Sequence, residues 1–595
     1  MVGKVCKTCR LTFAARMLRS RFLHIQNFGP REYITYEGES MTYAQTLEQS
    51  MLVAHWLQAQ FQVRKGDRVG IAMRNNLEHV VSWWACHLIG AVAVELNAFA
   101  DSDTMTFCIA DVGCRVVVCD IERWERIKPM LEDGKRLRQH ETGANTESDT
   151  LRGVAVIPFG KGKGAGRLPK SQRSYLQGDR HPMLFDYEEL GEKWKASCPK
   201  EPSRNLKVYP EDNCHILFTS GTTGRPKGVL ATHRQSLHNL GATLWIGARI
   251  FARRKRPLPD PAANPDVIKI LTAYPLFHAA GLLSQLVTNS ASGGKLVFMY
   301  QWDVDEAVKL MQQHKCNRFG GVAYMSRQLA QHPTELPNLS SISHGGSAAA
   351  RELAAESYVK TGNGIIGNGY GATETSSFAT GCYQDDYIAF PDGAGSAPPT
   401  TDIKIMDPVT LVEVPLRSKG EVWIRNSGIA EGYWNRPEAT AEAFMADGFY
   451  RTGDLGYMNE HDILFIVDRV KDLIIRAGEN ISCTVVENGV YACSKIIEAA
   501  AVALPDSSLG ERVAVFCVPR KGGEDVTVDE IKQAAKAAVV KHEVPEFVVI
   551  TNEPLPKIPA GKVDKKILRN MIVDIAKQKG WGDYAKGAQT SKAKL

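Results

Sequence analysis

The stretch LFTSGTTGRPKGVLATHR, residues 217–234, decides how the rest of the chain is interpreted. An apolar run, CHILF at 214–218, leads into it and predicts a buried strand, so the glycines fall in the turn that leaves that strand. Such a turn presents backbone N–H groups to an anion, and its hydroxyl side chains and Lys227 add further donors. The stretch therefore predicts a phosphate-binding loop rather than a flexible turn with a solvated lysine.

The spacing of this loop differs from two common nucleotide loops. A Walker A loop requires G-x-x-x-x-G-K-[ST], whereas residues 221–228 read GTTGRPKG. A protein kinase is also excluded, because no H-R-D-x-x-x-x-N or D-F-G motif follows. Another kind of phosphate chemistry is indicated.

Helical and strand patterns alternate on both sides of the loop. Apolar residues at helical spacing fill 41–60, and short β-rich runs follow at 67–73 and 114–120. The apolar stretch 80–100 is interrupted by His87, Gly90 and Glu95, which predicts a buried helix, a stop and a buried strand rather than a membrane span. This alternation predicts an α/β fold with a parallel sheet covered by helices.

The remaining segments define the expected domain organisation. Residues 131–205 contain a glycine-rich basic stretch at about 159–180 and are expected to form a surface insertion, and 252–266 is expected to be a loop. Residues 395–467 are strand-rich, and about 470–595 has the size of a small α+β domain. We expect an N-terminal domain over 1–469, a C-terminal domain over 470–580 and a polar tail over 581–595.

Composition limits the classes of function. The chain has 595 residues and a net charge of only +6, without a basic stripe carrying interleaved aromatics, so nucleic acid is not an expected partner. Thirteen scattered cysteines suit a reducing compartment. Cys6 and Cys9 form half of a zinc motif but lack the second half, so they are interpreted as free thiols. No signal peptide is evident, which favours the cytoplasm or import after folding.

Seven further motifs follow the loop in a fixed order: YPLFHAAGL (274–282), HGGSAA (344–349), GYGATET (369–375), GEVWIRNSGIAEGYWNRPEAT (420–440), YRTGDLG (450–456), DRVKDLIIRAGENIS (468–482) and LPKIPAGKVDKKIL (555–568). Together with TSGTTGRPKGV they resemble the adenylate-forming superfamily, which includes acyl-CoA synthetases, aryl-CoA ligases, luciferases and peptide-synthetase adenylation domains. The resemblance runs from about residue 31 to 570. It implies a large adenylation domain of several subdomains and a small mobile C-terminal domain.

The resemblance assigns the nucleotide site. It implies that the loop holds the β- and γ-phosphates of ATP, that Glu374 coordinates Mg²⁺ and that Thr373 donates to the α-phosphate. Tyr370 would cover the adenine, while Asp454 and Arg469 would contact the ribose. The complete set for ATP or AMP is Thr219, Ser220, Gly221, Thr222, Thr223, Gly224, Lys227, Gly345, Gly346, Ser347, Tyr370, Gly371, Thr373, Asp454, Arg469 and Lys562.

The resemblance also assigns catalysis and movement. Lys562 would bridge the substrate carboxylate and the α-phosphate, with Glu374 and Thr373 as the other catalytic residues. The small domain would turn about a hinge at Lys471 and bring Ala477, Gly478 and Glu479 towards coenzyme A. Asp468, Cys483 and Val485 depart from the usual glycine, proline and glutamate, which affects the expected geometry of transfer to the thiol.

The acid to be activated is only partly specified. Amino-acid-activating relatives carry an aspartate near the fourth signature, whereas here PLFHAAGLL is apolar apart from His278, which indicates a hydrophobic acid of undefined length. His278 and Gly346 are the expected acyl-site residues, with His278 as a gate or an ordinary core histidine. The terminal Ala593-Lys594-Leu595 resembles a peroxisomal address, so an import receptor and a peroxisomal location are expected.

The sequence thus predicts an ATP-dependent acyl-CoA synthetase that uses ATP, Mg²⁺ and coenzyme A. Three alternatives remain: an adenylating enzyme that loads a carrier protein, a luciferase-like oxygenase, and a non-catalytic nucleotide- or acyl-binding protein of the same fold.

Overall fold

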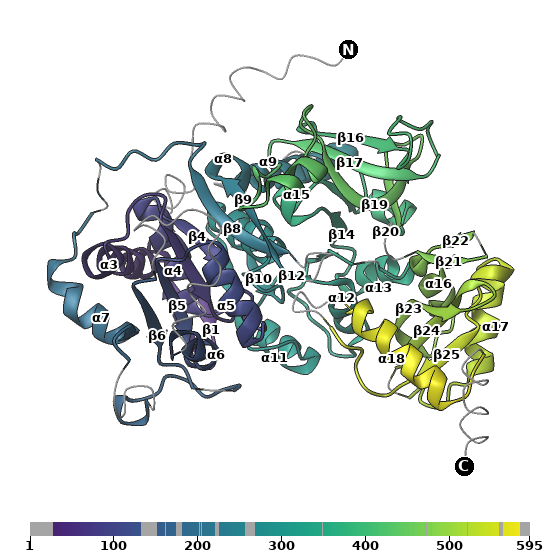
Figure 1. Cartoon of the computed structure of the whole chain (residues 1–595), viewed down its shortest axis with the longest axis horizontal. Coiled ribbons are helices and arrows are strands. Elements are labelled where there is room, and N and C mark those ends of the chain that lie inside the picture. The colour runs from purple at the N-terminus through teal and green to yellow at the C-terminus, as the bar shows by residue number, and fades with distance from the viewer. Residues whose placement is uncertain are drawn as a thin grey trace.

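The computed structural model describes residues 28–132 and 151–582, apart from 161, 174–180, 202, 204, 220–224, 256–267, 348, 470–472, 478, 521 and 558–562. Four sheets form within these described residues, and helices separate and cover them (Figure 1). The chain is a mixed α/β protein with a large N-terminal part and a smaller C-terminal domain, as its sequence predicts. Among the described helices, none combines the length and apolarity required to cross a bilayer.

The first sheet carries the quoted stretch. Its strand order is β18-β9-β8-β4-β3-β5-β6-β7, and the strands from β8 to β7 in this order are parallel, as predicted. Antiparallel β9 extends the edge and β18 pairs with it. The strands are β3 (Arg68–Ala72), β4 (Val92–Glu95), β5 (Val116–Asp120), β6 (Gly153–Ile157), β7 (Leu184–Asp186), β8 (Asn213–Thr219), β9 (Lys227–Thr232) and β18 (Gly432–Tyr433).

The second sheet follows the same principle. Its order is β15-β14-β13-β12-β10-β11-β1-β2, with antiparallel strands only at its two edges. Because ligands of such sheets bind beyond the carboxyl ends of the parallel strands, we expect ligand-binding residues at the ends of β13 and β14. The strands are β1 (Glu32–Tyr36), β2 (Glu39–Thr42), β10 (Lys269–Thr272), β11 (Lys295–Val297), β12 (Arg318–Gly321), β13 (Ser341–Gly345), β14 (Ile365–Tyr370) and β15 (Thr380–Tyr383).

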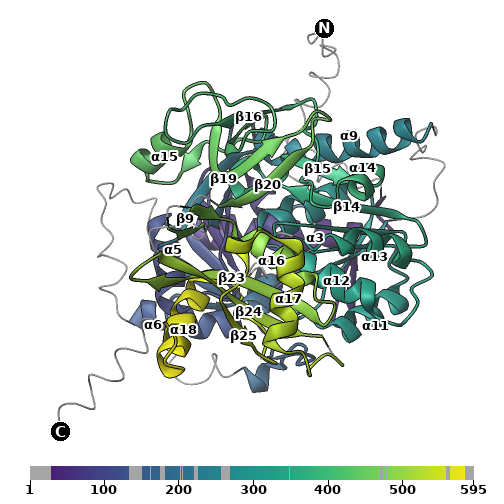
Figure 2. The ribbon, with the colours of Figure 1, turned by 90° about the vertical axis from the view of Figure 1, so that its right-hand side faces the viewer.

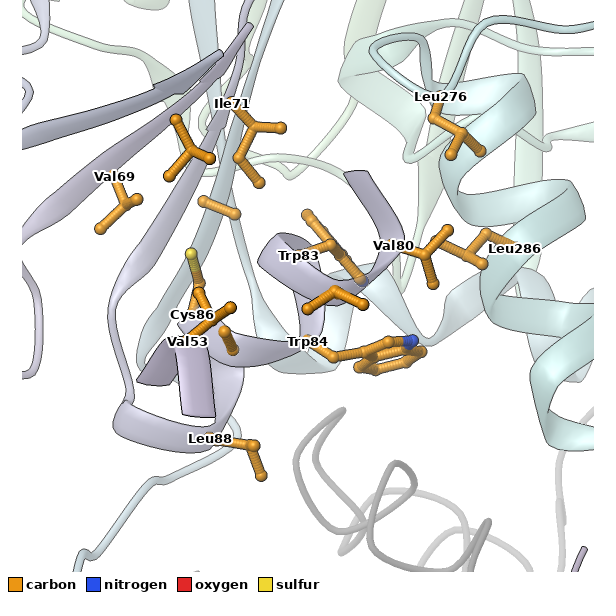
Figure 3. Packing of buried hydrophobic residues seen from close by; sticks show 14 of the residues in the cluster. Val53, Val69, Ile71, Val80, Trp83, Trp84, Cys86, Leu88, Leu276 and Leu286 are labelled. Atoms are coloured by element: carbon orange, nitrogen blue, oxygen red, sulfur yellow. The ribbon is translucent and has the colours of Figure 1, made fainter. Parts of the chain in front are cut away.

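The two sheets share one core through α3 (Tyr43–Phe61) and α4 (Leu77–Ile89). Every residue of α4 is buried, and Asn76 caps its start while Gly90 ends it in a left-handed conformation. Figure 3 shows Trp83 and Trp84 of α4 within this core, with Leu276 and Leu286 approaching from the second sheet's side. The predicted buried helix, stop and strand over 80–100 are therefore confirmed.

Residues 153–194 differ from the predicted surface insertion. β6 and β7 extend the parallel sheet, and α7 (Tyr187–Trp194) packs against α3. Val154, Ala155 and Val156 are fully buried. The short apolar run of β6 is flanked by polar and glycine-rich residues, so the sequence pattern did not indicate a strand there.

The C-terminal third of the chain forms the last two sheets. The strand-rich region becomes an antiparallel sheet of order β16-β17-β19-β20, as predicted. Beyond residue 472, β24 pairs with β23, β21 and β25, and α16, α17 and α18 pack around this sheet (Figure 2). The strands are β16 (Thr401–Met406), β17 (Gly420–Asn426), β19 (Tyr450–Met458), β20 (Leu464–Arg469), β21 (Ile474–Arg476), β22 (Glu479–Ile481), β23 (Ile496–Asp506), β24 (Gly510–Pro519) and β25 (Phe547–Ile550), and the helices are α16 (Cys483–Tyr491), α17 (Val528–Ala538) and α18 (Lys565–Gln578).

Other helices connect these layers and cover their faces. α8 (His233–Ser236) and α9 (His238–Arg253) follow β9, and a π-helix, Ala280–Val287, packs against α9. The rest are α5 (Ser102–Asp111), α6 (Ile121–Glu132), α10 (Thr288–Ala291), α11 (Val304–His314), α12 (Ala323–Gln331), α13 (Glu352–Lys360), α14 (Asp385–Ala389) and α15 (Pro437–Ala443).

Candidate active site

The two ends of the predicted phosphate loop lie side by side. β8 ends at Thr219 and β9 begins at Lys227, and these two residues are directly opposite in the antiparallel pair. The residues between them that the sequence assigns to the loop, Ser220, Gly221, Thr222, Thr223 and Gly224, lie outside the described residues. The hairpin thus fixes where the loop leaves the sheet and where it returns.

A tyrosine connects the end of this hairpin with Glu374. The Lys227 Nζ lies 4.8 Å from the centre of the Tyr433 ring. The Tyr433 hydroxyl donates a 2.8 Å hydrogen bond to Glu374 Oε1. Burial, followed by the charge of Glu374, raises the pKa of Tyr433, so the phenol remains a donor. Glu374 is itself buried, in a short helical turn over Thr373–Thr375.

The glycine turns at the ends of β13 and β14 bring backbone close to backbone. A Cβ on Gly345 would lie 2.4 Å from the Gly369 carbonyl oxygen, and one on Gly371 would lie 1.8 Å from that of Ser377. Only glycine fits these two positions without displacing backbone. Gly346 and Ser347 follow, and the Ser347 Oγ accepts a 3.4 Å hydrogen bond from the Ala323 N–H at the start of α12.

Asp454 is the centre of a second polar group. Its Oδ2 accepts a 2.7 Å hydrogen bond from the Tyr370 hydroxyl, and its Oδ1 accepts one of 3.1 Å from Arg469 Nε. Asp454 and Arg469 face each other across β19 and β20, while Tyr370 ends β14. Burial and then Asp454 raise the pKa of Tyr370 well above its usual range. The structure therefore brings together the three residues that the sequence assigns to adenine and ribose.

Lys557, which precedes the segment of Lys562, contacts the large domain. Residues 558–562 lie outside the described residues, but Lys557 and Val563, which flank them, form an antiparallel bridge. The Lys557 Nζ lies 3.3 Å above the centre of the Tyr324 ring and 3.1 Å from Glu498 Oε1. Tyr324 follows Ala323, the residue bonded to Ser347. The ends of the lysine segment thus lie beside the glycine turn of the predicted nucleotide site.

The remaining predicted residues lie elsewhere. Ala477 and Glu479 belong to the β21–β22 hairpin, where Ala477 has a left-handed φ of 51° and donates its N–H to the Leu509 carbonyl oxygen. His278 is half-buried just before the π-helix, with its ring tilted against Phe277 at 4.7 Å. Lys471, Gly478 and Ala593-Lys594-Leu595 lie outside the described residues.

A scan against family models matches residues 23–434 to "AMP-binding enzyme" and residues 485–562 to "AMP-binding enzyme C-terminal domain". The chain belongs to the AMP-binding enzyme family. The first match covers both parallel sheets and the second covers most of the small domain, while Asp454 and Arg469 lie between the two matches.

Two curated relatives show the range of this family. A long-chain-fatty-acid–CoA ligase of Bacillus subtilis (strain 168) is 28% identical over 557 residues, covering 91% of this chain and 92% of the relative. A 4-coumarate-CoA ligase of Narcissus pseudonarcissus is 25% identical over 557 residues, covering 92% of each. This AMP-binding enzyme is therefore similar over nearly its whole length to both fatty-acid and aryl-acid CoA ligases.

Two solved structures share the fold. The anthranilate CoA ligase AuaEII in complex with anthranoyl-AMP gives a TM-score of 0.76 at 19% identity, covering 94% of this chain and 97% of the other. A fatty acyl CoA synthetase of Mycobacterium tuberculosis gives 0.64 at 24%, covering 94% and 99%. These likenesses show the adenylate-forming fold.

Two contact residues were missed from the sequence, Tyr433 and Tyr324. Tyr433 lies within the quoted GYWN motif, but nothing in the motif specifies that its hydroxyl meets Glu374. Tyr324 belongs to an ordinary apolar segment whose approach to Lys557 depends on how the domains meet. Neither residue carried a signal at the level of local pattern.

Two residues that depart from the family pattern, Asp468 and Cys483, are hydrogen-bonded to each other. Asp468 Oδ2 accepts a hydrogen bond from the Cys483 N–H, which a proline at 483 would lack. The Ser482 hydroxyl donates a 2.7 Å hydrogen bond to the Val467 carbonyl oxygen beside it. These two bonds join the end of β20 to the start of α16 across residues 470–472, so we name Asp468 and Cys483 the cross-domain pair.

Proposed function

We propose that this AMP-binding enzyme is an ATP-dependent acyl-CoA synthetase for a hydrophobic carboxylic acid. The carboxylate attacks the α-phosphorus of ATP, the bond to pyrophosphate breaks, and an acyl-adenylate forms. The sulfur of coenzyme A then attacks the acyl carbon, AMP leaves and the thiol proton passes to solvent. The products are acyl-CoA, AMP and pyrophosphate.

The meeting of Lys557 with Tyr324 beside the glycine turn is the observation that supports this proposal most strongly. It places Lys557 beside α12 at that turn, and we assign Lys562, five residues further along the chain, to the nucleotide site of Tyr370 and Asp454. A cation there would neutralise the charge that develops between the carboxylate and the α-phosphate, where a fixed electrostatic partner has its greatest effect. We assign Lys562 this catalytic role.

The phosphates of ATP are assigned to the β8–β9 loop, with Lys227 at its end. A magnesium ion fits the same region, because Glu374 offers a buried carboxylate and Mg²⁺ is usually held by one or two carboxylates together with substrate phosphates. When bound, the ion would offset charge on the departing pyrophosphate. Tyr433 would hold Glu374 in place through its hydroxyl.

The hydrophobic acid is supported by the apolar segment that contains His278 and by the relatives, whose names give fatty-acid and 4-coumarate substrates. Phe277, next to His278 in the sequence, meets Phe99 edge to face at 5.8 Å, and Arg74 lies over the other ring, that of Phe99. Apolar contacts discriminate weakly between chain lengths, so we expect activity on a series of related acids.

The test is a panel of fatty and aryl acids in a pyrophosphate-release assay, with and without coenzyme A. We expect ATP-dependent release with several hydrophobic acids, an acyl-CoA product by mass spectrometry, and little release beyond one equivalent per enzyme without coenzyme A. Alanine and glutamate are matched controls that should give no product. Four outcomes would contradict the proposal and support an alternative. They are equal turnover without coenzyme A, transfer only to a carrier protein, light emission with oxygen, and nucleotide binding without turnover.

The cross-domain pair leads to a prediction about the two half-reactions. In this arrangement the lysine segment meets the large domain, so the pair stabilises the state assigned to adenylation. Asp468→Ala removes the acceptor of the Cys483 N–H, a loss of about 1–2 kcal/mol for a bond to a charged group. We therefore expect adenylate formation to slow about tenfold while transfer from a preformed adenylate is retained.

Single-turnover measurements of each step check this prediction. Asp462→Ala, an exposed substitution in the turn before β20, is the matched control and should change neither rate. An Asp468→Ala enzyme whose two steps slow by the same factor would show that the pair stabilises the fold generally rather than one arrangement.

A further inference from the structure

Three potential metal ligands meet in the interior, away from the proposed active site. They are His87 of α4, Cys214 of β8 and His233 of α8. All three are buried, and their ligand atoms lie within 4.8 Å of one another. The Cys214 Sγ is 3.9 Å from His87 Nδ1. The rings of His87 and His233 meet edge to face, with centres 5.4 Å apart.

The histidines of this cluster have unpaired nitrogens. Both ring nitrogens of His233, and His87 Nε2, have no hydrogen-bond partner among the described residues, although each is buried. Buried polar atoms are normally hydrogen-bonded, so three such nitrogens in one place require an explanation. A metal ion would account for part of this, because it accepts an electron pair from one nitrogen of each ring.

From this geometry we propose that His87, Cys214 and His233 form a binding site for a divalent transition metal, of which Zn²⁺ is the best match. One thiolate and two imidazoles suit a borderline-soft ion. Tetrahedral zinc places its ligand atoms about 3.3–3.8 Å apart, so the side chains need to close by about 1 Å. A water molecule would complete the coordination.

The surroundings suit such a site. A backbone hydrogen bond links the site to the partly exposed surface. The His233 N–H donates to the Asp212 carbonyl oxygen, and Asp212 forms a 2.6 Å ion pair with Lys65 at the partly exposed surface above it.

The position of the site defines its role. His233 follows Thr232, which pairs with Asn213 beside Cys214, at the end of the β8–β9 hairpin opposite to Thr219 and Lys227. About five strand residues separate the two ends, or roughly 17 Å at 3.3 Å per residue. The metal would therefore act as a structural clamp that holds the base of the phosphate-loop hairpin to α4, without contacting the substrates.

The test begins with the full chain expressed in zinc-supplemented medium and analysed for metal by mass spectrometry. We expect about one zinc per chain, and at least a tenfold loss of zinc in Cys214→Ser. Cys119→Ser, at a fully buried cysteine of β5 in the same sheet, is the matched control and should keep its zinc. The double variant Cys6→Ser/Cys9→Ser should keep it too, because the proposed site uses neither residue.

Cobalt provides a second readout that does not depend on activity. Chelator-treated wild-type protein refilled with Co²⁺ should show a thiolate-to-cobalt charge-transfer band and a raised Tm, and Cys214→Ser should lose both effects. His233→Asn should weaken cobalt binding at least tenfold if the variant folds. If it does not fold, Cys214→Ser still tests the site, because serine is nearly equal in size to cysteine. Zinc retained by Cys214→Ser, or no band and no change in Tm with the wild type, would overturn the proposal.

Discussion

Lys562→Ala is expected to slow formation of the acyl-adenylate by at least about 100-fold, the range observed when one fixed electrostatic partner of a reacting group is removed. Transfer of the acyl group from a preformed adenylate to coenzyme A should proceed at nearly the wild-type rate, because the lysine is assigned to the first step alone. ATP–pyrophosphate exchange measures the first step, and a synthetic acyl-adenylate supplied with coenzyme A isolates the second.

The structure explains why neighbouring lysines should not rescue this variant. In the sequence, Lys557, Lys565 and Lys566 make the charge near Lys562 locally redundant but not its geometry, and the structure shows that Lys557 and Lys565 are engaged elsewhere. Lys557 contacts Glu498 and Tyr324, and Lys565 forms a 2.8 Å ion pair with Glu487. Lys566 is exposed, so Lys566→Ala is the matched control and should exchange pyrophosphate normally. Wild-type exchange in Lys562→Ala would remove the lysine from the reaction.

Asp454→Ala is expected to weaken ATP binding about 100-fold. A carboxylate has about four acceptor positions, and Tyr370 and Arg469 occupy two of them. The other two match the two ribose hydroxyls. Losing two hydrogen bonds to a charged acceptor, at about 1.5 kcal/mol each, amounts to about 3 kcal/mol or two decades in Kd. Isothermal titration with ATP or a non-hydrolysable analogue measures the change directly.

A surface aspartate provides the control for this measurement. Asp402 pairs with Arg425 at 2.9 Å on the neighbouring strands β16 and β17, where both side chains are largely exposed. Because exposed ion pairs contribute little, Asp402→Ala should leave nucleotide affinity within a factor of two or so. Unchanged ATP affinity in Asp454→Ala would mean that the acidic group stabilises the sheet instead of holding the ribose.

Much of the fold could be predicted from local pattern. The helix over 43–61, the buried helix α4 and the strands β3 to β5 each match an uninterrupted apolar run or a clear helical spacing. In the small domain, the runs AAAVAL (499–504) and RVAVFCV (512–518) predict two strands and VDEIKQAAKAAVVKH (528–542) predicts a helix, and these occur as β23, β24 and α17. Its further elements, β25 and α18 among them, have shorter or mixed patterns that depend on packing against β23 and β24.

The residues of the candidate site were predicted from sequence motifs rather than from local apolar patterns. Motifs placed Tyr370, Asp454 and Arg469 in one site, and the structure joins them by hydrogen bonds. The contact of Lys557 with Tyr324 could not be predicted, because it depends on the packing of one domain against another rather than on any run of residues. The same holds for the meeting of His87, Cys214 and His233, which lie up to 146 residues apart in the sequence.

The cross-domain pair restricts how this enzyme can be recombined with its relatives. A graft that exchanges the small domain at residues 470–472 would keep Asp468 but place a foreign residue at 483, and where that residue is proline the buried carboxylate would lose the hydrogen bond from that N–H. Hybrids should therefore carry positions 468 and 483 from the same parent, with the crossover moved before 468 or beyond 483.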